Sequence, residues 1–174
     1  SQTEIQNLMA LHQRGLDDDV ISKAASLVKE HPEEIILFNL LGISYERRGS
    51  LKSAAEAYKN ALKINPNIPE MNFNLGAILF SENKVEEAIQ FYEKSIQLNN
   101  NFPEAYFNLG IALQSMGRFD EAIQCYQKAI QIQPGFFEAI TNMGTIMQLQ
   151  GHLDEAAEFF KKSLSIREDG RGHY

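Results

Sequence analysis

Residues 106–134 read YFNLGIALQSMGRFDEAIQCYQKAIQIQP, and this stretch decides the fold. Its apolar residues follow helical spacing as far as Met116, and the spacing begins again at Phe119. Gly117 stands at the break, where a residue that can adopt positive φ ends one helix and turns the chain. The stretch is therefore predicted to form two helices joined by a short turn. Asn83 takes the place of this glycine in one of the other copies described next.

The same pattern returns every 34 residues along most of the chain. One recurring column is always glycine, one is always alanine and one is always aromatic. These columns are Gly42, Gly76, Gly110 and Gly144; Ala54, Ala88, Ala122 and Ala156; and Tyr58, Tyr92, Tyr126 and Phe160. Small residues let two helices approach closely, so we expect Gly76 to lie opposite Ala88, with the Tyr92 ring filling the space toward the neighbouring unit. Because one helical hairpin cannot bury its own apolar face, stacked copies are predicted to form an all-α solenoid.

The order of residues within each copy resembles the tetratricopeptide repeat: an aromatic, Leu-Gly, a large residue, alanine, an aromatic, a small residue and proline. The resemblance covers Ile35 to about Ile166 and implies a right-handed superhelix of helix-turn-helix hairpins with a concave and a convex face. Three positions depart from the family pattern. Asn72 and Ile140 stand where an aromatic residue is usual, and Asn100 replaces the closing proline.

The repeat also predicts how the chain is divided. Residues 1–34 form a degenerate first repeat, full repeats span 35–68, 69–102, 103–136 and 137–170, and residues 171–174 form a tail. In the first repeat, helices are predicted at 3–13 and 19–30, and Leu8 replaces the recurring glycine. Terminal repeats are often atypical because one of their faces meets water instead of a neighbour.

The C-terminal end of the array lacks a visible cap. The last helix, predicted at 154–166, carries the apolar residues Phe159, Phe160, Leu164 and Ile166 and is followed only by REDGRGHY. Repeat arrays generally need a polar capping element at such an end. We expect either that the chain is a piece of a longer protein, which we favour, or that a partner covers this end.

Composition and charge disfavour several classes of function. The 16 Lys and Arg residues against 23 Asp and Glu give a net charge of −7, which opposes the phosphate neutralisation that nucleic-acid binding requires. No apolar run is long enough to cross a bilayer, so no membrane insertion is expected. The single cysteine, Cys125, allows no internal disulfide, and no signal peptide is visible. We therefore expect a cytoplasmic location and no nucleic-acid partner.

No catalytic or metal-binding constellation stands out in the sequence. The four histidines are His12, His31, His152 and His173. No two of them share the helical spacing that would hold a metal. Cys125 has no basic neighbour except Lys128 to depress its pKa, and the glycines do not form a phosphate-binding loop. We expect no enzymatic activity, no metal and no cofactor.

Binding remains, and the family resemblance implies where it occurs. In the resembling family, the first helix of each repeat lines the concave face, where ligands bind as extended peptides. The matching residues are Phe73, Asn74, Phe80, Phe107, Asn108, Ile111, Gln114, Asn142 and Gln148. The three asparagines, one repeat apart, resemble the asparagine-lined groove of the repeat domain in O-linked N-acetylglucosamine transferases; Leu40 breaks the column. A carboxamide matches a peptide unit, and one rung would serve roughly three residues of extended ligand, which rises about 3.3 Å per residue.

Several of these residues allow a second interpretation. The asparagines could instead satisfy neighbouring backbone groups, and Phe73 and Phe107 could belong to the core, although we favour anchors because the core columns are already filled. The recurring first-turn glutamates are expected to offset the helix macrodipoles rather than to bind basic ligands. They are Glu70, Glu104 and Glu138. The clamp positions carry no Lys or Arg, which disfavours the co-chaperone type of groove that grips a terminal carboxylate.

Three hypotheses of function follow. The first is a non-catalytic scaffold that binds an extended protein segment on the concave face, from Phe73 to Gln148. The second is the substrate-recognition portion of a larger enzyme, such as a glycosyltransferase or a sulfotransferase. The third is self-association through the uncapped apolar helix near Phe159 and Leu164.

Overall fold

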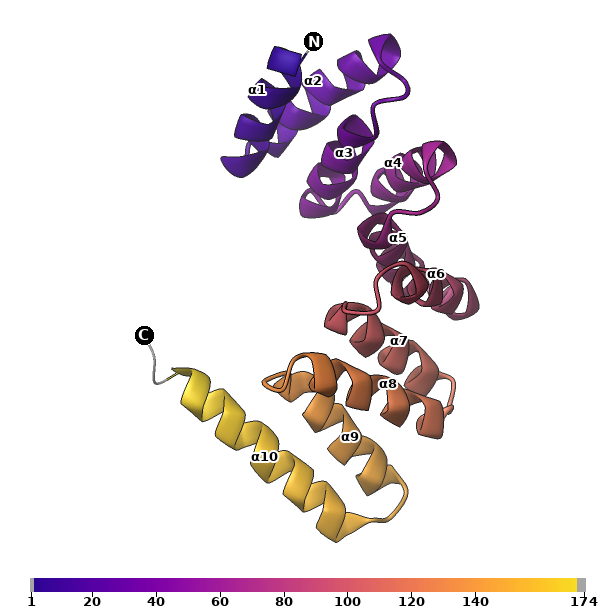
Figure 1. Cartoon of the computed structure of the whole chain (residues 1–174), viewed down its shortest axis with the longest axis vertical. Helices are drawn as coiled ribbons and strands as arrows, with labels where there is room; N and C mark the ends of the chain where they lie inside the picture. The colour runs from indigo at the N-terminus through magenta and orange to yellow at the C-terminus, as the bar shows by residue number, and fades with distance from the viewer. Residues whose placement is uncertain (1, 172–174) are drawn as a thin grey trace. The chain divides into compact units, whose positions relative to one another are not determined.

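The computed structural model describes residues 2–171, and that range holds ten α-helices and no strand (Figure 1). The helices are α1 Gln2–Gln13, α2 Asp17–Glu30, α3 Ile35–Arg47, α4 Leu51–Ile64, α5 Pro69–Ser81, α6 Val85–Leu98, α7 Pro103–Ser115, α8 Phe119–Ile132, α9 Phe137–Leu149 and α10 Leu153–Arg171. The predicted all-α fold of helical hairpins is confirmed. Among the described residues, no helix combines the length and the apolar character that a membrane span requires.

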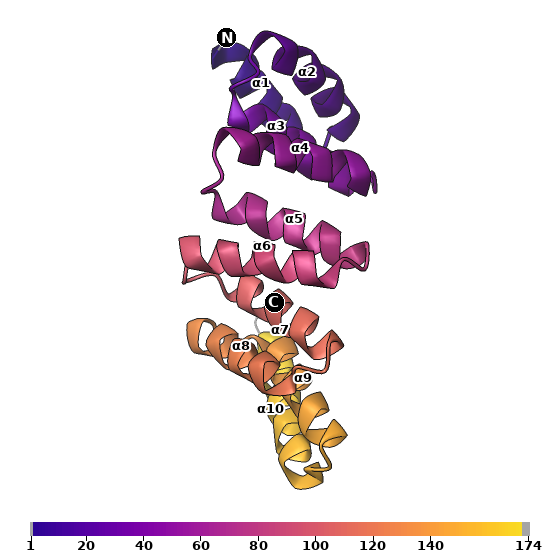
Figure 2. The ribbon, with the colours of Figure 1, turned by 90° about the vertical axis from the view of Figure 1, so that its right-hand side faces the viewer.

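The chain divides into two compact units. The N-terminal unit ends at Asn83 and contains α1 to α5, and the C-terminal unit begins at Lys84 and contains α6 to α10. In the N-terminal unit, buried Leu8 and Leu27 of the first hairpin pack with Leu37 of α3. In the C-terminal unit, α7 lies beside α8 and α9 beside α10 (Figure 2). Each unit therefore has its own apolar core.

The turn after each first helix has one recurring geometry. Gly117 adopts φ +74°, its N–H donates to the Gln114 carbonyl at 3.0 Å, and the Arg118 N–H donates to the Leu113 carbonyl at 3.0 Å. This pair of hydrogen bonds is a Schellman motif, which requires a residue in the left-handed region. Asn83 adopts φ 61° at the end of α5, as predicted for the copy that lacks the glycine.

Two predicted helix boundaries need correction. α2 begins at Asp17 rather than at residue 19, and α10 continues to Arg171 although the apolar pattern predicted its end at Ile166. The residues that follow Ile166 are mostly polar, and a helix propagates through such residues as long as its hydrogen-bond ladder is unbroken. Of the predicted tail, Arg171 is the last residue of α10, and residues 172–174 lie outside the described residues.

Asn72 shows how one departure from the repeat pattern is accommodated. Its side chain is buried, and its Nδ2 donates to the carbonyl oxygens of Pro66 at 3.1 Å and Ile68 at 2.8 Å. The aromatic residue expected in this column would leave those two carbonyls without this donor. The asparagine therefore fastens the loop before α5 to the helix that follows it.

The recurring glycine lies against the aromatic residue of the same hairpin. A methyl group built on Gly110 would lie 2.5 Å from Cε1 and 2.8 Å from Cδ1 of Tyr126, and one on Gly144 would lie 2.8 Å from Cε1 of Phe160. The expectation that alanine lies opposite the glycine is therefore wrong for Gly110, because its three nearest heavy atoms all belong to the Tyr126 ring. Glycine is needed because the ring occupies the volume that a Cβ would fill.

We expect Gly110→Ala to lower the free energy of unfolding by about 1–2 kcal/mol. Overpacking costs about 1–3 kcal/mol, and the better helix propensity of alanine returns at most about 1 kcal/mol. The matched control is Gly135→Ala, because nothing lies within 4 Å of a methyl group at that exposed position. Urea denaturation of both variants measures the difference, and equal midpoints would contradict this account of the packing.

Candidate functional site

Each asparagine of the predicted ladder is tied to the tyrosine of the preceding repeat. Asn74 Nδ2 on α5 donates to the Tyr58 hydroxyl at 3.2 Å, and Asn142 Nδ2 on α9 donates to the Tyr126 hydroxyl at 3.3 Å. A hydrogen bond from the Asn108 side chain likewise reaches Tyr92. The asparagines therefore bind a side-chain hydroxyl, not the neighbouring backbone considered in the sequence analysis. All three remain half-buried and reachable from solvent.

The tyrosine hydroxyl passes its own proton to a third residue. Tyr58 donates to Oε2 of Glu46 at 2.5 Å, and Tyr126 donates to Oε1 of Gln114 at 2.7 Å. We call Glu46–Tyr58–Asn74 the N-terminal relay and Gln114–Tyr126–Asn142 the C-terminal relay. Each relay joins three consecutive elements that carry a repeat and the start of the next, and each lies wholly within one unit.

Burial dominates the titration of these hydroxyls. It raises the pKa of Tyr126 to about 12, while the hydrogen bond from Asn142 acts in the opposite direction. Burial likewise raises the pKa of Tyr92 to about 12, against a lowering by Asn108. For Tyr58, burial and the neighbouring Glu46 carboxylate both raise the pKa. The hydroxyls are therefore neutral donors at physiological pH.

The other predicted site residues divide between the two units. Phe73 and Phe80 lie half-buried on α5, in the N-terminal unit with Asn74. In the C-terminal unit, Ile111 is half-buried and Gln148 is exposed. The C-terminal relay brings Gln114 together with Asn142, whereas Gln148 belongs to a repeat whose aromatic residue, Phe160, has no hydroxyl.

Phe107 has a packing role that the sequence left open. Its ring centroid lies 5.8 Å from that of Tyr126 and 4.8 Å from that of Phe136, in tilted geometry typical of favourable aromatic pairs. The ring is nevertheless only half-buried. Phe107 therefore both packs at the junction between repeats and presents part of its surface to solvent.

Sequence reasoning missed Glu46 and Phe136. Glu46 stands 34 residues before Phe80 and belongs to the column that continues through Gln114, and Phe136 stands 34 residues after Phe102. The spacing was therefore a usable signal. Glu46 was overlooked because Leu40 interrupts the asparagine column in the same repeat.

Known repeat families match most of the chain. Models described as tetratricopeptide repeat match residues 103–136 and 125–158, and one described as TPR repeat matches residues 42–81 and 76–117. Together they run without a gap from residue 42 to residue 158. The chain belongs to the tetratricopeptide-repeat (TPR) family. No curated protein matches it.

Solved TPR structures are similar over nearly the whole chain. A crystal structure of MamA is 30% identical, covers 94% of this chain and 96% of its own, and superposes with a TM-score of 0.89. MamA from Desulfovibrio magneticus RS-1 is 18% identical, with 97% and 95% covered and a TM-score of 0.89. YrrB, described as a TPR protein with an unusual peptide-binding site, is 20% identical, with 95% and 86% covered and a TM-score of 0.84. The last two likenesses concern the fold alone.

Reactive chemistry is not concentrated in this TPR array. Cys125 is half-buried, and burial, followed by the nearby Glu121 and Glu93 carboxylates, raises the pKa of its thiol to about 11. The thiol is therefore protonated at neutral pH and a weak nucleophile. Within residues 2–171, no group of three or more His, Cys, Asp or Glu side chains is placed to hold a metal ion.

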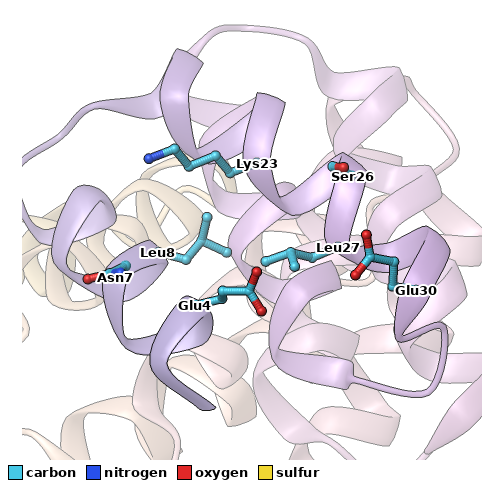
Figure 3. A pocket seen from close by; sticks show the side chains of 7 residues that line it. All are labelled: Glu4, Asn7, Leu8, Lys23, Ser26, Leu27 and Glu30. Carbon is cyan, nitrogen blue, oxygen red and sulfur yellow. The ribbon is translucent and has the colours of Figure 1, made fainter. Parts of the chain in front are cut away.

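The first TPR hairpin presents a polar face. A hollow of about 340 Å³ lies between α1 and α2, with Leu8 and Leu27 among its lining and Asn7, Lys23 and Glu30 around them (Figure 3). At these three polar positions, the residues 34, 68, 102 and 136 further along the chain are all apolar. The hollow is thus a repeat-type surface whose rim has been made hydrophilic, as suits a face that meets water.

The last TPR hairpin keeps an apolar face. A hollow of about 400 Å³ between α9 and α10 is lined by Thr141, Phe160 and Leu164, among others. Leu164 is 55% exposed, whereas Ile130, one repeat earlier, is half-buried. Thr141 also replaces the larger Phe107 of the previous repeat, which leaves room beside the Phe160 ring.

We expect Tyr126→Phe to lower the free energy of unfolding by about 0.5–1.5 kcal/mol, because Asn142 Nδ2 and Gln114 Oε1 both lose their partner. The control is Tyr106→Phe, a half-buried tyrosine of the same unit for which no hydrogen bond from the hydroxyl is found among the described residues. Chemical denaturation compares the two variants. Equal losses of stability would mean that the C-terminal relay does not join the repeats.

Proposed function

We propose that this TPR chain is a non-catalytic scaffold that binds an extended protein segment on the face formed by its first helices. The observation that carries the proposal is the tethering of the three asparagines: each is half-buried, and each is held by a tyrosine of the preceding repeat. Held side chains lose little further conformational entropy when a ligand binds. A carboxamide that is already oriented is therefore an efficient contact for a peptide backbone.

The C-terminal unit supplies the densest set of such contacts. Asn108 on α7 and Asn142 on α9 are one repeat apart, and Phe107 and Ile111 expose apolar surface on α7 between them in sequence. Polar groups would hold the backbone of the ligand while the apolar surface accepts its side chains. The description of YrrB as a TPR protein with a peptide-binding site is in keeping with this use of the fold.

The proposal predicts that peptides selected from a random display library against the whole chain lose affinity when the asparagines are truncated. We expect Asn142→Ala to weaken binding about tenfold, which corresponds to about 1.4 kcal/mol, a value expected for one lost peptide contact. Gln127→Ala, on the exposed surface of α8, is the control and should bind as the parent does. Titration calorimetry measures both, with thermal melting to verify that the variants are folded. Unchanged affinity for Asn142→Ala together with loss for Gln127→Ala would place binding elsewhere.

We propose association of the chain with itself through the last hairpin as a second function, because of the apolar hollow there. Leu149, Leu153 and Leu164 are 65%, 65% and 55% exposed, and the hollow beside Leu164 has apolar walls. Exposed leucines this close in one hairpin are typical of a surface that is buried in an assembly.

In this case the mass measured by light scattering should rise with concentration, and Leu164→Asp should hold the chain at the monomer mass because an aspartate cannot be buried unpaired. Leu51→Asp changes an exposed leucine at the start of α4 and should behave as the parent chain does. A parent chain that stays monomeric at every concentration would refute association through this hairpin.

A further inference from the structure

The N-terminal relay differs from the C-terminal relay in one atom group, and this difference has chemical consequences. Its third member is the carboxylate of Glu46, where the C-terminal relay has the carboxamide of Gln114. Glu46 lies on α3, Tyr58 on α4 and Asn74 on α5, all in the N-terminal unit. The Tyr58 oxygen is 2.5 Å from Glu46 Oε2 and 3.2 Å from Asn74 Nδ2.

The carboxylate fixes the direction of the hydrogen bonds. An ionised carboxylate can only accept, so Tyr58 must give its single proton to Glu46. The Tyr58 oxygen can then only accept from its other partner, which turns the amide nitrogen of Asn74 toward it and the carbonyl Oδ1 away. In the C-terminal relay, Gln114 can donate or accept, and the chain of bonds is satisfied in either direction. Only the N-terminal relay must present a carbonyl oxygen.

The Glu46 carboxylate also carries a charge that nothing nearby neutralises. The side chain is half-buried, and this burial raises the pKa of the carboxyl group, whereas the hydrogen bond from Tyr58 lowers it. The adjacent cations are engaged elsewhere, Arg47 with Asp17 at 3.4 Å and Arg48 with Asp18 at 3.0 Å, both on α2. Among the described residues, no hydrogen bond or ion pair to Glu46 Oε1 is found.

We propose that Glu46 and Asn74 together form a subsite for a lysine or arginine side chain of the bound segment. Both side chains hydrogen-bond to one hydroxyl, which brings the carboxylate and the amide close together, and both present acceptors only. A cationic side chain supplies several donors and the positive charge that this half-buried carboxylate lacks. A neutral peptide N–H could satisfy the acceptors but would leave the charge uncompensated. The net charge of −7 further favours approach of a basic segment.

The chain contains its own matched control for the charge. Glu46→Gln turns the N-terminal relay into the same Gln–Tyr–Asn arrangement that the C-terminal relay already has, so the hydrogen bonds are kept and only the charge is lost. Gln114→Glu makes the reciprocal change in the C-terminal unit. Neither substitution alters side-chain size appreciably, so loss of folding is not expected.

The test rests on the proposed peptide binding and begins from the same library of random displayed peptides, selected separately on the parent chain and on Glu46→Gln. We expect lysine or arginine to be enriched at one position of the peptides selected on the parent chain and not on the variant. In a selected peptide, replacing that lysine by norleucine, or that arginine by citrulline, should weaken binding to the parent chain at least about tenfold, as for other close charge pairs, and leave binding to Glu46→Gln nearly unchanged.

The outcomes separate this inference from the proposed function. Peptides that bind the parent chain with no basic preference, or a preference that persists in Glu46→Gln, would overturn the cation subsite while leaving peptide binding intact. A library that yields no binding peptide would overturn the proposed function and the subsite with it. Gln114→Glu provides the independent arm: it should add a preference for a second basic residue, and failure to do so would show that a carboxylate in a relay does not select cations.

Discussion

The contact between a tyrosine ring and the recurring glycine is the constraint from which the other features of the array derive. Because no Cβ intervenes, the Tyr126 ring lies directly on the backbone of α7 at Gly110 and is fully buried. A ring held in this way has one orientation, so its hydroxyl emerges at one place, within reach of the next first helix. Packing inside one repeat thus determines where a polar side chain of the following repeat is held. The candidate binding face is a product of the core.

The same scaffold supports different chemistry in successive repeats. The column that receives the tyrosine proton holds glutamate at Glu46, phenylalanine at Phe80 and glutamine at Gln114. The backbone of the helix that carries this column changes little, since each first helix spans 13 residues from Ile35, Pro69, Pro103 or Phe137. Specificity can therefore change by single substitutions in one column while the tyrosine and asparagine that hold the repeats together stay as they are.

Much of this structure could be predicted from a 34-residue period, and the remainder needed three dimensions. The period placed the helices, the left-handed residues such as Asn83, and the asparagine column. It could not say that Gly110 faces Tyr126 rather than Ala122, because alignment shows that a position is small without showing what fills the space. The relays were invisible for a related reason: their members come from three helices, and no single helical face contains them. The extension of α10 was missed because helical order there does not depend on apolar spacing.

The polar rim of the first hairpin gives the array a direction. Any of the four full repeats carries apolar residues at the positions of Asn7, Lys23 and Glu30, so a duplicated internal repeat would meet its neighbours with surfaces that already match. A duplicated first hairpin inserted further along would instead bury Lys23 and Glu30 against an apolar helix, at a penalty of several kcal/mol per unpaired charge. In evolutionary terms, the protein can lengthen by copying residues 35–170 but not by copying its beginning, and its hydrophilic first hairpin is the one module that has lost its interchangeability.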